Sequence, residues 1–236
     1  MLIHRIKDTI RLENEKRAKP LSVPEIMPSL QSELGAPLPL HVSLSRTLQI
    51  KTDDREEFLD TLSSSLRRAA VQIFRPEFHG LNWVRNLERN RWFLVLGIKK
   101  PAHDELNRLL NACNEAAQMC GHPALYSGSK GDGPMEVNTS TTSVQEVAGE
   151  KIDRSENFHV SIAWNLTEPA PEWIALVQSI DVDKYVPSPQ AGFYVVKVRV
   201  GNVVHNIRLG RRRSSHGTGY GSTTLGVDVN LYDRDA

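Results

Sequence analysis

The chain has 236 residues, of which 39% are hydrophobic and 24% charged, with a net charge of +1. This composition is typical of a soluble globular protein and excludes a wholly disordered chain, while the length allows one large domain or two small lobes. The near-zero charge excludes a global attraction to nucleic acid, so a polyanion would have to meet a local basic patch. The absence of a long apolar run excludes a membrane span, and the charged N-terminus argues against a secretory signal.

Residues 1–37 are predicted to be a charged and proline-rich N-terminal segment. It could start with a short strand or helix within 1–19, and beyond that regular structure is short at best, because five prolines fall between positions 20 and 39. Apolar and polar residues then alternate from Leu40 to Ile50, which predicts a strand with one face on the core. The next stretch, 52–71, has acids in its first turn and apolar residues at helical spacing. It is predicted to form an amphipathic helix.

Two strands are predicted at 77–83 and 91–98, followed by a second amphipathic helix at 101–121. The two cysteines, Cys113 and Cys120, lie two turns apart on this helix and too far apart to bridge. We therefore expect them to be reduced, as in a cytosolic or nuclear protein. Residues 127–156 are polar and poor in large apolar groups, and are predicted to be a mobile insertion.

The order of elements then repeats itself. A strand is predicted at 158–166, a short helix at 171–181, and a hairpin at 191–209 around the two-residue turn Gly201-Asn202. Residues 211–236 are interpreted as a disordered basic and polar tail. The predicted fold is thus an α+β domain over 38–210, with two pseudo-symmetric lobes of antiparallel sheet and helices outside.

A histidine and a serine interrupt the apolar alternation in the opening strand of each half. The first strand carries His41 and Ser43, and the later one carries His159 and Ser161. Since residues i and i+2 of a strand point to the same side, each pair shares one face. If the halves pair about a pseudo-two-fold axis, all four side chains converge in one groove.

Two imidazoles and two hydroxyls in one groove suit phosphodiester chemistry on RNA. One histidine can take the proton of a 2′-hydroxyl while the other, protonated, gives a proton to the departing 5′-oxygen. The hydroxyls can donate to the phosphate oxygens as charge builds up. The product is a 2′,3′-cyclic phosphate, which the same groups could open with water, and these residues leave open which histidine is the acid.

A single H-x-S motif is more often structural than catalytic, but two on matching strands favour a site. No zinc-type spacing of cysteine or histidine is present, so no metal and no cofactor are expected. The other histidines are interpreted as surface or helix-end residues (His4, His79, His103, His122 and His205). The four tryptophans are interpreted as core or lobe-contact residues (Trp83, Trp92, Trp164 and Trp173).

The stretches "PLHVSLSRTL" and "FHVSIAWNL" resemble the two signature motifs of the two-histidine (2H) phosphoesterase superfamily. They are most similar to its spliceosomal small nuclear RNA phosphodiesterase branch, fungal type, over residues 38–210 except for the insertion. The resemblance implies a metal-independent 3′-to-5′ exoribonuclease that trims the uridine-rich 3′ end of U6 small nuclear RNA, leaving a cyclic phosphate or a 3′-phosphate. It makes His41, Ser43, His159 and Ser161 the catalytic quartet.

The resemblance also implies a nuclear protein that binds single-stranded uridine-rich RNA, and we expect a monomer without membrane contact. Family members stack the terminal base on an aromatic residue upstream of the second motif, and Tyr126 is the candidate here. A tyrosine at a strand end with a solvated hydroxyl is an equal alternative for that residue.

The Gly/Asn/Trp-rich stretch and strand that precede the first motif in relatives are missing from this sequence. One alternative is a general 2′,3′-cyclic or 2′,5′ phosphodiesterase of the superfamily. The other, if the missing strand is essential, is a non-catalytic RNA-binding protein.

Overall fold

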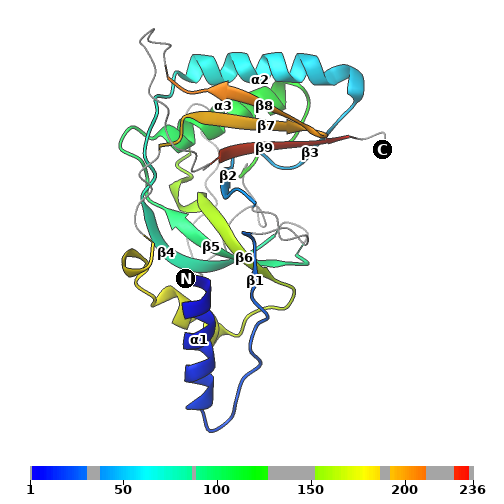
Figure 1. Ribbon diagram of the computed structural model, residues 1–236. Helices are drawn as coiled ribbons and strands as arrows, with labels where there is room; N and C mark the ends of the chain where they lie inside the picture. The colour runs from blue at the N-terminus through cyan, green and yellow to red at the C-terminus, as the bar shows by residue number, and fades with distance from the viewer. Residues whose placement is uncertain are drawn as a thin grey trace.

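Two β-sheets, each accompanied by two α-helices, form the computed structural model (Figure 1). The structure describes residues 2–30, 38–86, 89–126, 152–186, 192–210 and, as backbone alone, 226–233. Mixed helices and sheets agree with the predicted α+β class. Within the described residues, no helix is long and apolar enough to cross a membrane.

The first sheet has four antiparallel strands in the order β1-β6-β5-β4. Its strands are β1 (Met27–Pro28), β4 (Phe78–Arg85), β5 (Trp92–Ile98) and β6 (His159–Asn165). The predicted strands at 77–83, 91–98 and 158–166 are thereby confirmed to within two residues. Two irregularities in register, one at Gly80 in β4 and one at Ile162 in β6, bend the sheet and increase its twist.

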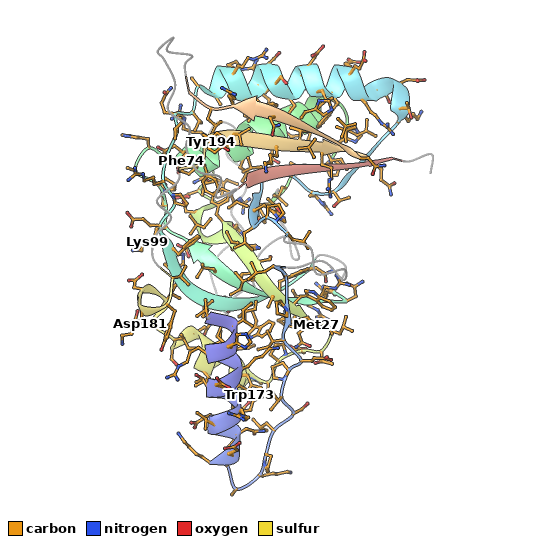
Figure 2. All side chains as sticks on the ribbon, in the orientation of Figure 1. Met27, Phe74, Lys99, Trp173, Asp181 and Tyr194 are labelled. Atoms are coloured by element: carbon orange, nitrogen blue, oxygen red, sulfur yellow. The ribbon has the colours of Figure 1, made fainter. Side chains whose placement is uncertain are left out.

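Helices α1 (Leu2–Glu15) and α4 (Pro171–Gln178) lie below this sheet in Figure 1 and contact each other. Three isoleucines at helical spacing on α1 are buried: Ile3, Ile6 and Ile10. On α4, Trp173 is fully buried and donates from its indole Nε1–H to the carbonyl of Ser22 at 2.8 Å. Figure 2 shows Trp173 beside α1 and Met27 on β1.

The predicted domain boundary at residue 38 is therefore wrong for the N-terminal segment. Within residues 1–37, α1 packs through its apolar stripe and β1 adds a strand to the first sheet. A short strand or helix is expected at the start of this segment, and the structure has a helix of 14 residues there, because its three-residue isoleucine stripe anchors it through buried apolar area.

The second sheet has five strands, with β2-β9-β7-β8 in order and β3 beside β9. Its strands are β2 (His41–Ser43), β3 (Leu48–Ile50), β7 (Val195–Val200), β8 (Val203–Arg208) and β9 (Gly226–Asp233). The predicted hairpin is confirmed, since β7 and β8 pair antiparallel around Gly201 and Asn202. The expectation of purely antiparallel sheets is wrong here, because β9 runs parallel to β2, β3 and β7.

The prediction of a disordered tail over residues 211–236 is wrong for the part that forms strand β9. Residues 226–233 form the central strand of the second sheet rather than an unstructured end. The sequence "GVDVNLYD" alternates apolar and polar residues with a period of two, which is the pattern of a half-buried strand. The glycines and charged residues around this stretch favoured the prediction of disorder instead. Residues 211–225 lie outside the described residues.

Helices α2 (Arg55–Ala69) and α3 (Glu105–Met119) contact each other and lie on the side of the second sheet in Figure 1. Both confirm predicted amphipathic helices. In α2, Glu56 and Glu57 occupy the first turn and Arg67 and Arg68 the last, as the helix dipole favours. Both cysteines are free, Cys113 being buried, and burial raises the pKa of the Cys113 thiol to about 12.

The predicted insertion at 127–156 falls mostly outside the described residues, which exclude 127–151. Its last residues differ from the prediction, because 152–156 form a loop bonded to α3 and begin the short 3-10 helix η2 (Ser155–Asn157).

Candidate functional site

The two H-x-S strands come from different sheets and contact each other: β2 of the second sheet meets β6 of the first. In each strand the histidine and serine are half-buried and flank a fully buried valine, Val42 in β2 and Val160 in β6. The predicted alternation thus holds in both strands. His41 and His159 are close enough for the charge of one to act on the pKa of the other.

The imidazole of His159 is oriented by a backbone carbonyl. Its Nδ1 lies 2.7 Å from the carbonyl oxygen of Asn157. Because a carbonyl can only accept, Nδ1 carries a hydrogen, and Nε2 is the atom that gains or loses the titrating proton. Burial lowers the pKa of His159, and the nearby His41 lowers it further, while the hydrogen bond to Asn157 opposes both effects. The lowered pKa favours the neutral imidazole of His159, in which Nε2 carries the lone pair.

Tyr126 lies beside the same carbonyl. Its hydroxyl donates to the Asn157 oxygen at 3.2 Å, and its half-buried ring packs against the core. The residue adopts a left-handed backbone conformation with φ of 55°, which is uncommon outside glycine and asparagine. The structure thus brings Tyr126 next to the second H-x-S motif, as the stacking hypothesis requires. Its hydroxyl is bonded within the protein, unlike the solvated tyrosine of the alternative.

The loop that leads into β6 is fixed to α3 by a buried amide. Asn107 on α3 is 3% exposed. Its Nδ2 donates to Asp153 at 2.8 Å and to Ser155 at 3.1 Å, and its Oδ1 accepts from the backbone N–H of Arg154 at 2.9 Å. Lys100 also pairs with Asp153 at 2.7 Å, and this pairing, with the hydrogen bonds from Ser155 and Asn107, holds the pKa of Asp153 well below its usual range. Sequence reasoning missed this support.

Gly97 on β5 makes room for His79 on β4. Gly97 pairs with His79 on one side and with His159 on the other. A Cβ at Gly97 would lie 2.7 Å from Nε2 of His79 and 2.9 Å from the His79 backbone oxygen. The imidazole ring of His79 can turn away from such a Cβ. The backbone oxygen of His79 can move only if β4 and β5 separate.

We predict that Gly97→Ala destabilises the protein by about 1–3 kcal/mol, the usual cost of overpacking. Denaturant titration measures this change. Gly121→Ala has open space around its Cβ and a positive φ, so it serves as the control for backbone strain alone. An unchanged stability for Gly97→Ala would contradict the described fit of β4 against β5.

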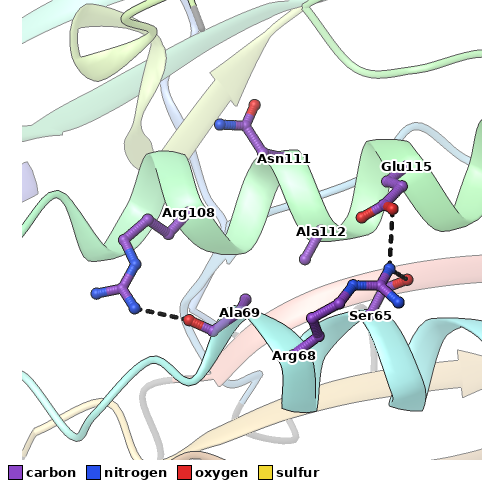
Figure 3. Close-up of a pocket in the computed structure, with 7 residues that line it drawn as sticks. All are labelled: Ser65, Arg68, Ala69, Arg108, Asn111, Ala112 and Glu115. Carbon is purple, nitrogen blue, oxygen red and sulfur yellow. Dashed lines mark hydrogen bonds and ion pairs between the residues drawn. The ribbon is translucent and has the colours of Figure 1, made fainter.

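An open groove between α2 and α3 contains none of the predicted site residues (Figure 3). Its charged side chains are already bonded within the protein. Arg68 pairs with Glu115 at 2.8 Å, and Arg108 donates to the carbonyl of Ala69 at 2.6 Å. In the described part of the chain, no group of three or more histidine, cysteine or acidic side chains could hold a metal ion.

Comparison with known proteins assigns the family. The HVSL family, described as an uncharacterised conserved protein, matches residues 3–208, which include both motifs. The chain belongs to the HVSL family. The four letters of that name are the residues found here at positions 41–44.

Individual relatives of this HVSL protein agree with the resemblance predicted from its motifs. A Neurospora crassa protein named U6 snRNA phosphodiesterase 1 is 28% identical over 202 residues, which is 75% of this chain and 49% of that protein. The chain therefore spans about half the length of that relative.

Two solved structures share the fold. Kluyveromyces marxianus Usb1 with uridine monophosphate matches with a TM-score of 0.54 and 16% identity over 87% of this chain and 90% of that one. A second structure of Kluyveromyces marxianus Usb1 matches with a TM-score of 0.54 and 18% identity over 87% and 91%. The predicted resemblance to the small nuclear RNA phosphodiesterase branch is confirmed.

Proposed function

We propose that this protein is a phosphodiesterase that removes nucleotides from the 3′ end of RNA, with His41 and His159 as the acid–base pair. The contact between β2 and β6 is the observation that carries the proposal, since it joins two H-x-S motifs that are more than a hundred residues apart in sequence. Each H-x-S strand belongs to a different sheet, and this supports the proposal that the two sheets are the two lobes expected of the two-histidine phosphoesterase fold.

His159 is the general base in this proposal, because its lowered pKa favours the neutral imidazole, in which Nε2 carries the lone pair. Nε2 takes the proton of the 2′-hydroxyl on the penultimate nucleotide, and the 2′-oxygen attacks the phosphorus. The bond from phosphorus to the 5′-oxygen of the terminal nucleoside breaks, and protonated His41 gives its proton to that oxygen. The products are a shortened RNA with a 2′,3′-cyclic phosphate and a nucleoside with a 5′-hydroxyl.

Ser43 and Ser161 are proposed to donate hydrogen bonds to the non-bridging phosphate oxygens as negative charge develops. Each serine shares a strand face with its histidine, which supports this role. Tyr126 is proposed to stack on the terminal base, since its ring lies at the start of β6 next to His159. These side chains complete the step without further groups, and we expect a chelator to leave the rate unchanged.

The substrate is proposed to be the uridine-rich 3′ end of U6 small nuclear RNA, with a role in the nucleus. The name of the Neurospora crassa relative supports this assignment, and the two motifs agree with it. The protein is expected to act as a monomer.

The pKa of His159 sets the acidic side of the pH–rate profile. Because the base must be neutral and its pKa is lowered from 6.5, kcat/KM should rise with pH through an apparent pKa below 6.5 and be lost as pH falls through it. Steady-state cleavage of a short oligouridylate across pH measures this limb. An acidic limb above 6.5, or a flat profile between about pH 5 and 8, would count against His159 as the base.

The decisive experiment removes the nucleophile. An oligouridylate with a single 2′-deoxy nucleotide at the penultimate position should resist cleavage, while the same substitution at the terminal position should be tolerated. Equal cleavage of the two substrates would rule out attack by the 2′-oxygen and with it the proposed function.

A further inference from the structure

A tryptophan and an arginine lie together at the far end of β6 from His159. The guanidinium carbon of Arg91 is 4.4 Å from the ring centroid of Trp164, within the range of a cation–π contact. Trp164 is half-buried and Arg91 is exposed. Within the described residues, no ion pair joins Arg91 to a carboxylate. Trp164 is one of the four tryptophans expected at core or lobe-contact positions.

Strand pairing puts this pair on the same sheet face as the second H-x-S motif. Side chains of directly paired residues point to one face of a sheet. On β5, the residues two apart that share this face are Gly97, Val95, Phe93 and, just before the strand, Arg91. Their partners on β6 are His159, Ser161 and Trp164. Ile162 is the extra residue at the bulge, so the alternation resumes with Trp164 on the face of Ser161.

The two ends of β6 differ in what they offer to an RNA chain. Tyr126 and His159 meet at Asn157, just before the strand begins. Trp164 lies three residues beyond Ser161, about 10 Å further along at the usual rise of a strand. On its other side Trp164 pairs with half-buried Met27 of β1. An aromatic ring, an apolar neighbour and a guanidinium with no carboxylate partner among the described residues are the groups that bind a base and its phosphate.

We propose that Trp164 and Arg91 form a subsite for a nucleotide that lies upstream, on the 5′ side, of the penultimate nucleotide in single-stranded RNA. This inference rests on the proposed function and gives the RNA a direction along β6. The terminal nucleotide lies at the Tyr126 end, and the retained chain runs past Ser161 to Trp164. The guanidinium of Arg91 stacks on the base or contacts the adjacent phosphate.

The same β4–β5 hairpin contains a matched pair on the opposite face. The guanidinium carbon of Arg85 lies 5.6 Å from the ring centroid of Trp92. Trp92 is 3% exposed and belongs to the core cluster, and Arg85 donates to the carbonyl of Arg89. Arg85 therefore offers the same charge and the same type of ring contact, but on the face away from the H-x-S residues. It is the natural control for Arg91.

The test compares Arg91→Ala and Trp164→Leu with Arg85→Ala on a uridine dinucleotide and on a longer oligouridylate. Loss of base stacking should raise KM for the longer RNA by about 10-fold or more in both subsite variants. The kcat values and the KM for the dinucleotide should stay unchanged, since the dinucleotide does not reach the subsite. Trp164→Phe should retain most of the affinity for the longer RNA, because it keeps an aromatic ring. If Trp164→Leu fails to fold, Trp164→Phe and Arg91→Ala still test the subsite.

Binding of the longer RNA, followed by fluorescence anisotropy, separates the two proposals. If the wild-type protein cleaves neither RNA, the proposed function fails. The subsite is still supported in that case if Arg91→Ala weakens binding and Arg85→Ala does not. Equal effects of Arg91→Ala and Arg85→Ala, or equal loss on the short and long substrates, would overturn the subsite.

Discussion

Replacing His159 with alanine is expected to lower the rate of RNA cleavage by about 100- to 10,000-fold, the usual contribution of a general acid or base. His41→Ala should have an effect of the same size, because the leaving 5′-oxygen then departs without its proton. Both substitutions leave Ser43, Ser161 and the surrounding sheets in place. RNA binding, measured separately by anisotropy, should therefore change little in either variant.

His4→Ala is the matched control for these two variants. His4 is exposed on α1. This helix contacts α4 and lies on the side of the first sheet away from β2 (Figure 1). Its substitution should leave the rate unchanged. Because the two histidines act in one step, the double variant should be hardly slower than either single variant. Cleavage that survives both single substitutions would rule out the acid–base assignment.

Replacing Trp173 with alanine is expected to lower the free energy of unfolding by about 3–5 kcal/mol, as is typical of a large aromatic residue lost from a core. The ring is fully buried, and Arg17 lies over it at 5.0 Å. The substitution also leaves the Ser22 carbonyl without its donor. Since whole domains are stable by only about 5–15 kcal/mol, this change should cause a large drop in the denaturation midpoint.

Trp173→Phe separates packing from hydrogen bonding. It keeps an aromatic ring in the cavity and loses the indole donor, so it should cost clearly less than the alanine variant. Guanidinium titration followed by circular dichroism measures both. If Trp173→Ala were as stable as the wild type, the packing of α4 against residues 17–22 would be wrong, and with it the inclusion of the N-terminal segment in the fold.

Periodicity in the sequence predicted most of the fold. Apolar spacing located α2 and α3, and alternation located β6 and the hairpin of β7 and β8. Strands β4 and β5 also lie where strands were predicted. It failed where composition was given more weight than pattern. The isoleucine stripe of α1 and the alternating residues 226–233 of β9 were both present, but proline, glycine and charge around them favoured irregular structure. Nothing local in residues 226–233 indicates that their partners are β2, β3 and β7.

The candidate site could be predicted in part. Repetition of H-x-S on two strands identified His41 and His159, and the contact between β2 and β6 agrees with a shared location. The groups that orient His159 had no such signal. Its acceptor is the backbone carbonyl of Asn157, which any residue could provide, and the loop is fixed by Asn107, far away in sequence. Contacts of this kind follow from tertiary packing alone.

In the proposed reaction, the RNA's own 2′-oxygen attacks the phosphorus between two histidines. Mass spectrometry of an oligouridylate after brief digestion in the presence of chelator tests this most directly. We expect a shortened RNA that ends in a 2′,3′-cyclic phosphate, or in the 3′-phosphate formed when that ring opens, together with released uridine. A shortened RNA with a free 3′-hydroxyl, released together with uridine 5′-monophosphate, would contradict it.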